Sequence, residues 1–323
     1  MTAVRRHVLG DAVSAERYLA AAVSLGQELT SVTAASAGRT LARLIPGFRF
    51  RGIEQRLSVW DLFVIWHWAT MQLPTVPSAP MRNQAHGGPV FLPWHRMFLL
   101  RMEQQLQRVS GDPDAGLPYW DWAVAGGDLP PSEQLNQPLW SDALLGPARG
   151  EVDRGPLAGH RVRVEERVDG LWSIPPRALQ RAAATRVARL PRSADVDRAL
   201  GAARYDRAPW DSSVTTLRNL VEGWIDGPQL HNRVHVWVAG DMLVGTSPND
   251  PVFYLNHANV DRIWESWMAA GVRTYEPAAN EPGAPSGHRL DDAMVALLGA
   301  PQTPRQVLDP NAWYAYDTHY SLP

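Results

Sequence analysis

The chain has 323 residues, of which 45% are hydrophobic and 20% charged, and its formal net charge at pH 7 is −2. This composition is ordinary for a packed globular protein, and the nearly balanced charge gives no reason to expect nucleic acid or an anionic membrane as a partner. The apolar runs are far shorter than the roughly 20 residues that span a bilayer. Cysteine is absent, which excludes disulfides, iron–sulfur clusters, thiolate nucleophiles and thiolate metal ligands.

An arginine pair near the start, Arg5 and Arg6, is typical of a twin-arginine export signal. Such a signal needs an apolar stretch after the pair, whereas Gly10, Asp11 and Glu16 follow here. We therefore expect a cytoplasmic protein, with export alongside a helper protein left open.

Helical patterns dominate the N-terminal half. Residues 12–30 are alanine-rich and carry apolar residues at helical spacing. A second helix is predicted over residues 58–72, because its leading serine is followed three positions later by an aspartate, as in a capping box. A third is predicted over residues 94–109, opened by Pro93, since proline is favoured at the first helical position.

The C-terminal half has the same character. Residues 160–165 alternate as a short strand does, and helical order is expected again over residues 213–224 and 229–238. Asp250 followed by proline predicts the start of a further helix that ends near residue 270. These patterns predict a mainly α fold with long loops and a few short strands.

Two groups of three histidines stand out from the rest of the sequence. Neutral imidazole is a common ligand for copper, zinc, iron and nickel, so two triplets predict two metal ions side by side, each with an open position. A lone buried histidine is usually satisfied by hydrogen bonds, but that explanation does not account for six in clusters. The triplets are His67, His86 and His95, and His231, His235 and His257; the other histidines are His7, His160, His288 and His319.

The spacing of His231 and His235 places both rings on one face of a helix. Zinc proteases use the same spacing, with a glutamate after the first histidine as general base. Here that residue is Asn232. A hydrolytic zinc site therefore lacks its catalytic group and leaves the first triplet unexplained.

Longer segments around these histidines resemble the tyrosinase family, and most of all its bacterial members with a single catalytic core. The resemblance identifies residues 57–125 and 215–268, approximately, as the first and second copper motifs of one catalytic domain over residues 1–323. The segments that carry it are GPVFLPWHR (88–96), LPYWDW (117–122), HNRVHVW (231–237), SPNDPVFY (247–254) and NHANVDR (256–262).

The resemblance implies a dicopper centre with O2 as co-substrate. His67, His86 and His95 would hold the first copper ion, and His231, His235 and His257 the second. The ligands would project from a four-helix bundle, with His86 coming from a loop. Plant and fungal relatives bond a cysteine to the second histidine of the first triplet, and Gln84 in this chain excludes that thioether.

The resemblance also assigns a catalytic role to Glu222 and Asn232. In the family this pair holds a water that takes the proton of an incoming monophenol, a general-base role. The alternatives are that Glu222 forms a salt bridge with an arginine such as Arg218, and that Asn232 only caps a loop.

Further residues are expected around the second triplet. Phe253, four positions before His257, would pack against a ligand imidazole or simply belong to the core. Asp261, four positions after, would hydrogen bond to a ligand's second nitrogen, or instead form a salt bridge with Arg262 or Arg96. Asn256 stands where many relatives have another histidine, and we expect it near the substrate mouth, where it would bias substrate choice.

At the C-terminal end, Tyr314 and Tyr316 resemble the Tyr-x-Tyr motif that closes the family's core domain. In the family this motif pairs with an N-terminal arginine, here Arg5 or Arg6, through a cation–π contact. The alternative is an ordinary edge strand.

Three functions remain open. The first is a copper oxidase and monooxygenase that converts phenols and o-diphenols to o-quinones. The second is an o-aminophenol oxidase that makes quinone imines in secondary metabolism, and the third is a haemocyanin-like O2 carrier. The expected partners are a small phenolic or aminophenolic substrate and, as the resemblance implies, a helper protein that loads copper.

Overall fold

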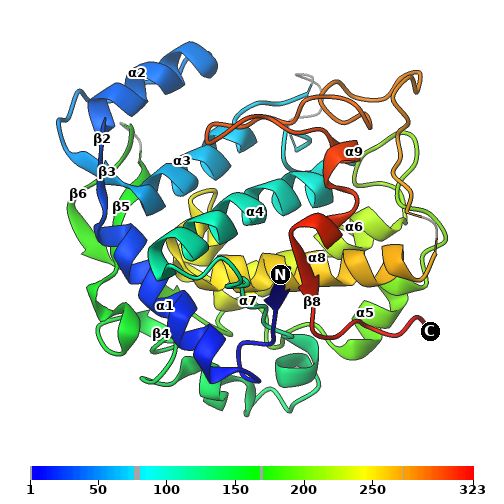
Figure 1. Cartoon of the computed structure of the whole chain (residues 1–323), viewed down its shortest axis with the longest axis horizontal. Coiled ribbons are helices and arrows are strands. Elements are labelled where there is room, and N and C mark those ends of the chain that lie inside the picture. Colours follow the sequence, from blue (N-terminus) through cyan, green and yellow to red (C-terminus); the bar gives the residue numbers. More distant parts are fainter. Residues whose placement is uncertain (1, 76–80, 168–169, 272) are drawn as a thin grey trace.

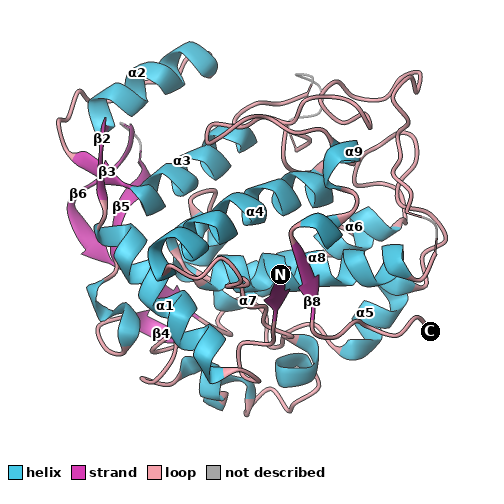
Figure 2. Cartoon of the chain, in the orientation of Figure 1, coloured by secondary structure: helices cyan, strands magenta, loops and turns pink. Residues whose placement is uncertain are grey.

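Helices form most of the regular structure in the computed structural model, which describes residues 2–75, 81–167, 170–271 and 273–323 (Figures 1 and 2). The helices are α1 (Ala12–Gln27), α2 (Ala34–Leu44), α3 (Val59–Met71), α4 (Phe91–Ser110), α5 (Ser193–Leu200), α6 (Leu217–Glu222), α7 (Leu230–Val238), α8 (Val252–Ala269) and α9 (Pro304–Val307). Long loops connect them. The predicted mainly α fold with a few short strands is confirmed.

The strands form two-stranded pairs. β1 and β8 run parallel and bring the two ends of the chain together, with Ala3 opposite Tyr314 and Arg5 opposite Tyr316 (Figure 1). The other pairs are antiparallel. The strands are β1 (Ala3–Arg5), β2 (Leu29–Thr33), β3 (Arg56–Ser58), β4 (Arg149–Glu151), β5 (Arg161–Arg167), β6 (Gly170–Ala178), β7 (Gln180–Ala182) and β8 (Tyr314–Tyr316).

The start of α3 follows the predicted capping box. The Ser58 side chain accepts a hydrogen bond from the backbone N–H of Asp61, and the Asp61 carboxylate accepts one from the backbone N–H of Ser58. These two bonds satisfy donors that a helix start leaves free. The apolar sequence from Trp60 to Ala69 then lets α3 lie almost wholly buried in the centre of the molecule.

The predicted start of α4 at Pro93 was wrong by two residues, because the helix begins at Phe91. Pro93 fits inside the first turn, since the N–H groups of that turn have no intrahelical acceptor to lose. The helix ends at Gly111, whose φ of +68° lies in the left-handed region that glycine adopts without strain. His95 therefore lies in the second turn of α4.

Two other boundaries also differ from the sequence patterns. α1 ends at Gln27 instead of residue 30, because Leu29–Thr33 pairs as β2 with β3. The predicted helix over residues 213–224 is limited to α6 (Leu217–Glu222), which ends at Gly223 in a left-handed conformation. In both places a tertiary contact or a glycine overrides local helical spacing.

The core lies between α3, α4, α7 and α8, with α4 and α8 in direct contact and α1 packed across α3 and α4 (Figure 1). Aromatic side chains fill the space between α3 and α4: the ring centroids of Trp66 and Trp94 are 5.6 Å apart, and those of Phe63 and Phe98 5.5 Å. Such rigid rings fix the two helices relative to each other.

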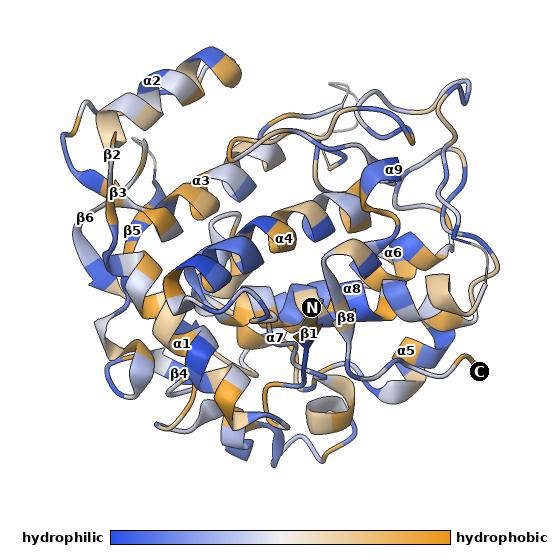
Figure 3. Cartoon of the chain, viewed as in Figure 1, coloured by the Kyte–Doolittle hydropathy of each residue, from blue (hydrophilic) through white to orange (hydrophobic). Residues whose placement is uncertain are grey.

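Hydrophobic and hydrophilic residues are mixed along the helices, as Figure 3 shows for α1 and α4. Within the described part of the chain, the helices lack a stretch that is both long and apolar enough to cross a membrane.

Candidate metal centre

The six predicted ligand histidines come together in the middle of the helical core. α3 supplies His67, α4 supplies His95, α7 supplies His231 and His235, and α8 supplies His257. His86 lies in the loop between α3 and α4, as expected. Within each triplet, one ring nitrogen from each histidine lies within 4.8 Å of the others.

The two triplets lie against each other. The rings of His95 and His257 are stacked with their centroids 4.3 Å apart, and the centroids of His86 and His231 are 6.4 Å apart. Two metal ions held by these triplets would therefore be neighbours, as in two-metal sites generally.

Backbone carbonyls fix the orientation of four of the six imidazoles. A carbonyl oxygen only accepts, so the bonded Nδ1 carries the proton and Nε2 keeps its lone pair for a metal. The Nε2 atoms of His67 and His95 are buried without a hydrogen-bond partner. The Nδ1 bonds run from His67 to Gly245 O (2.8 Å), His95 to Phe91 O (2.8 Å), His231 to Glu222 O (3.2 Å) and His235 to Met242 O (2.6 Å).

Burial sets the protonation state of these rings. It lowers the pKa of His67 to about 3 and that of His235 to about 4. Burial, together with the repulsion between neighbouring imidazoles, also holds the pKa values of His86, His95, His231 and His257 well below their ordinary value. All six are thus neutral at pH 7, the form that binds a metal.

The loop that carries His86 is held by side-chain acceptors. Asn83 Oδ1 accepts hydrogen bonds from the backbone N–H groups of Ala85 (3.0 Å) and His86 (2.9 Å). The next residue, Gly87, donates its backbone N–H to Glu222 Oε1 at 2.7 Å. The position of His86 is therefore set by the backbone on both sides of it, which compensates for its Nδ1 having no partner.

His288 closes this loop from the other side. Its Nε2 lies 3.0 Å from the carbonyl oxygen of Asn83, and its Nδ1 accepts a 3.4 Å hydrogen bond from the backbone N–H of Val90. A Cβ at Gly88 would lie 2.8 Å from the His288 ring, so the contact needs a glycine there. Sequence reasoning missed this residue, because a single histidine far along the chain carries no local signal.

A cavity of about 550 Å³ opens beside both triplets. Four ligand histidines line it: the buried His67, His86 and His231 and the partly buried His235. Most of its other lining residues are apolar or neutral, and they include Trp224 and Val244. A small organic molecule therefore has access to the face on which the metals would sit.

Glu222 is fully buried behind this cavity and does not line it. Its Oε2 pairs with Arg218 at 3.2 Å, so the alternative of a salt bridge is present in the structure. Burial nevertheless raises the pKa of Glu222 above its ordinary value, although Arg218 opposes this. Asn232 does line the cavity, and its amide donates to the carbonyl oxygen of Gly223 at 3.2 Å.

Phe253 lies between a ligand from each triplet, with its ring centroid 4.1 Å from that of His257 and 5.0 Å from that of His67. It is also fully buried, so both interpretations of this residue apply.

The structure corrects the placement of Asn256. It is fully buried, both of its amide atoms lack a partner, and it does not line the cavity. Successive residues on a helix point about 100° apart, so the Asn256 side chain leaves α8 at a different angle from the His257 ring.

The family model described as the common central domain of tyrosinase matches residues 57–270. The chain belongs to the tyrosinase family. It is 43% identical over 241 residues to a tyrosinase from Streptomyces glaucescens, covering 72% of this chain and 80% of that one. It is 32% identical over 295 residues to a grixazone synthase from Streptomyces griseus, covering 81% of this chain and 91% of the relative.

A solved polyphenol oxidase from Thermothelomyces thermophila has the same fold, with a TM-score of 0.68 at 20% identity over 98% of this chain and 88% of that one. The tyrosinase family is dicopper, and the two triplets of neutral imidazoles with inward-facing lone pairs fit two copper ions. The chain is thus a tyrosinase-like copper oxidoreductase.

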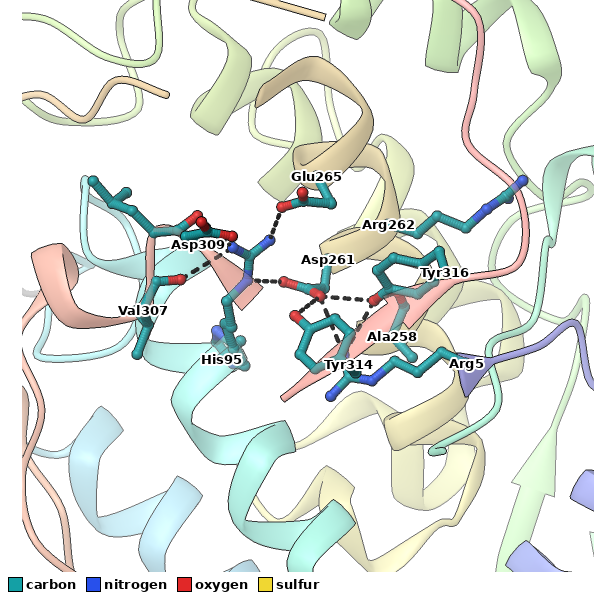
Figure 4. A network of polar contacts seen from close by, with 12 residues as sticks. Arg5, His95, Ala258, Asp261, Arg262, Glu265, Val307, Asp309, Tyr314 and Tyr316 are labelled. Carbon is teal, nitrogen blue, oxygen red and sulfur yellow. Dashed lines mark hydrogen bonds and ion pairs between the residues drawn. The ribbon is translucent and has the colours of Figure 1, made fainter. Parts of the chain in front are cut away.

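Asp261 does not reach a ligand imidazole, which corrects the hydrogen bond expected for it. Its carboxylate binds Arg96 Nε at 2.6 Å and Arg5 Nη1 at 3.1 Å, and it accepts from the hydroxyls of Tyr314 and Tyr316 (Figure 4). Two guanidinium charges attract a carboxylate more strongly than a neutral imidazole N–H does. The alternative of a salt bridge with Arg96 is therefore the one that the structure has.

The same network joins the two ends of the chain. Arg5, and not Arg6, stacks over the Tyr314 ring, with its guanidinium carbon 3.4 Å from the ring centroid. The tyrosines also belong to β8, so the edge-strand interpretation and the arginine partner both hold.

Proposed function

We propose that this protein uses O2 to convert monophenols and o-diphenols to o-quinones. One observation carries the proposal: six neutral imidazoles form two adjacent triplets, and four of them line a cavity of about 550 Å³. Bound copper supplies the exchange of electrons with O2. The overall reactions are balanced with water as the other product: one monophenol and one O2 give one o-quinone and one water, and two catechols and one O2 give two o-quinones and two waters.

The chain's own residues orient the ligands. Carbonyls hold four of the imidazoles in one tautomer, and Phe253 fills the space between His67 and His257 with an apolar ring. The cavity admits the substrate on the opposite side. Ligands that are fixed in this way do not have to reorganise during the reaction.

We further propose that Asn232 and Glu222 receive the proton of a monophenol through a water. The support is that Asn232 lines the cavity next to His231 and that burial raises the pKa of Glu222, which makes its carboxylate a better proton acceptor. Gly87 and Arg218 bind two of the carboxylate's roughly four lone-pair positions, and the Trp224 side chain is a further hydrogen-bond donor to it.

A second candidate is oxidation of o-aminophenols to quinone imines. The observation that favours it is the likeness to a grixazone synthase over most of both chains. Side-by-side kinetics with 4-methylcatechol, a monophenol and an o-aminophenol, on protein of measured copper content, test both candidates. A kcat/KM for the aminophenol far above that for the catechol would replace the first proposal by the second. Binding of O2 without turnover of any of them would indicate a carrier.

Two copper ions per chain are expected by metal analysis after loading. One ion per chain, or zinc from copper-fed cells, would contradict the dicopper centre. A helper protein that loads copper also remains a proposal. It is tested by adding copper salt to the copper-free chain alone, where full occupancy without the helper would show that none is needed.

A further inference from the structure

We propose that the side-chain amide of Asn83 donates a hydrogen bond to the phenolic oxygen of the substrate. The inference rests on the proposed function and adds a substrate-binding residue to it. It is carried by the hydrogen bonds that Asn83 makes and by the place of its side chain in the cavity lining.

All polar groups of Asn83 except Nδ2 hold the loop around it. The backbone N–H donates to the carbonyl oxygen of His86 at 2.9 Å, and the backbone carbonyl oxygen lies 3.0 Å from His288 Nε2. Oδ1 accepts from the backbone N–H groups of Ala85 and His86. Because both of these partners are donors, the amide atom that faces them is the oxygen, and Nδ2 is the atom left over.

Nδ2 is available to a partner from outside the protein. Among the described residues it has no hydrogen-bond acceptor, yet it is not one of the side-chain nitrogens that are closed off without a partner. Asn83 is only 5% exposed, and it lines the cavity of about 550 Å³. The open part of its amide therefore faces the cavity, where water or a substrate can accept its N–H bonds.

The residue type at position 83 agrees with this. An aspartate or a serine can accept the same backbone N–H bonds in such a turn. Asparagine satisfies the turn with its oxygen and presents amide N–H donors in addition. Holding the loop therefore explains an acceptor at this position, but it does not explain the donor.

The donor lies near the ligand histidines. Oδ1 bonds directly to the backbone of His86, and His86 lines the same cavity as Asn83. A phenol whose hydroxyl reaches the ligand histidines thus brings its oxygen toward Nδ2. That oxygen becomes negative as its proton leaves, and a hydrogen bond to a charged acceptor is stronger than one to a neutral acceptor. Bound metal ions attract the same oxygen, and a neutral N–H donor adds to that attraction.

A thermodynamic cycle between protein and ligand tests this contact. The variant is Asn83→Ser, whose shorter side chain still accepts a backbone N–H bond but lacks the amide donor. The ligands are 4-nitrophenol and nitrobenzene, which differ in the hydroxyl, and calorimetry on the copper-loaded protein without O2 gives their dissociation constants. The substitution should raise the dissociation constant of 4-nitrophenol at least tenfold relative to that of nitrobenzene. The attraction of the metal ions is present in both proteins and cancels in this ratio.

The matched control is Gln84→Ser, which removes an amide from the next residue of the loop. Gln84 donates to the carbonyl oxygen of Ser286 and does not line this cavity, so the ratio of the two dissociation constants should stay near that of the wild type. An unchanged ratio in Asn83→Ser at full copper content would overturn the inference. Loss of the ratio in Gln84→Ser as well would also overturn it, because the effect would then come from the loop.

Copper content has to be measured in each variant, because Asn83 also holds His86. If Asn83→Ser loses copper, Asn83→Asp replaces it, since a carboxylate keeps both backbone N–H bonds and removes the donor. The same ratio should then fall by more than tenfold, and an unchanged ratio would overturn the inference. Absence of phenol turnover by the wild-type protein, with its preference for 4-nitrophenol intact, would overturn the proposed function alone.

Discussion

The carboxylate of Glu222 accepts a 2.7 Å hydrogen bond from the backbone N–H of Gly87, the residue that follows His86. The backbone carbonyl of the same glutamate accepts from Nδ1 of His231 at 3.2 Å. Glu222 thus holds one ligand from each triplet. A positioning role and a role as proton acceptor are both consistent with this geometry, and substitutions separate them.

Glu222→Gln keeps an oxygen for the Gly87 N–H but removes the basic carboxylate. We expect the ratio of monophenol to catechol turnover to fall at least tenfold, because a monophenol must lose its only phenolic proton to a base. Removal of one general base typically lowers the rate about 10²–10⁴-fold. Steady-state kinetics on both substrates measure this ratio. Glu222→Ala is the comparison variant, since it also removes the acceptor and should lower copper content. Equal losses on both substrates with Glu222→Gln would leave Glu222 a positioning role only.

His288→Ala should weaken the first copper site selectively. The substitution releases the loop at Asn83 and Val90, and loss of such an outer contact typically costs about 10–100-fold in metal affinity. Copper titration against a competing chelator measures the two sites. The matched control is His160→Ala, because His160 is equally buried and bonds to the carbonyl oxygen of Asn249, away from the ligands. A similar copper loss in both variants would refute a specific role for His288.

Asp261→Asn should destabilise the fold without a specific effect on copper. It leaves the buried guanidinium groups of Arg5 and Arg96 without their shared carboxylate, and breaking a buried pair in this way costs about 3–5 kcal/mol. Urea unfolding measures the loss. The control Asp291→Asn removes an exposed partner of Arg305 and should change little. If Asp261→Asn instead lowered copper affinity at unchanged stability, Asp261 would act on a ligand after all.

The copper-free chain should lose stability as the pH falls below about 6.5. Burial lowers the pKa of His160 to about 4, whereas the unfolded value is 6.5. Between these values only the unfolded chain binds the proton, so acid favours unfolding. For this one residue, the free energy of unfolding should be about 2 kcal/mol lower at pH 5 than at pH 7.

His160→Gln tests this, because it removes the titrating ring. Urea unfolding at the two pH values should show a smaller difference in the variant than in the parent chain. An unchanged difference would mean that His160 titrates normally in the folded state.

The sequence by itself predicted the mainly α fold, the helices that carry the histidines and the two histidine triplets, whose members the fold brings together in space. The capping box of Ser58 and Asp61 predicted the start of α3, and the spacing of His231 and His235 predicted that both rings lie on one face of α7. These features depend on residues within one or two turns of each other, and local backbone geometry decides them. The motifs around the six histidines then identified the family.

Only the tertiary structure decided the partners that lie far apart in the sequence. Asp261 binds Arg5 and Arg96 instead of a ligand, Asn256 is buried outside the cavity lining, and His288 contacts the His86 loop from about 200 residues away. A carboxylate or an imidazole takes the strongest partner that the packed fold brings within about 3 Å, and local spacing carries no information on that distance. The lining of the cavity has the same origin, because it is assembled from separate loops and helices that meet only after folding.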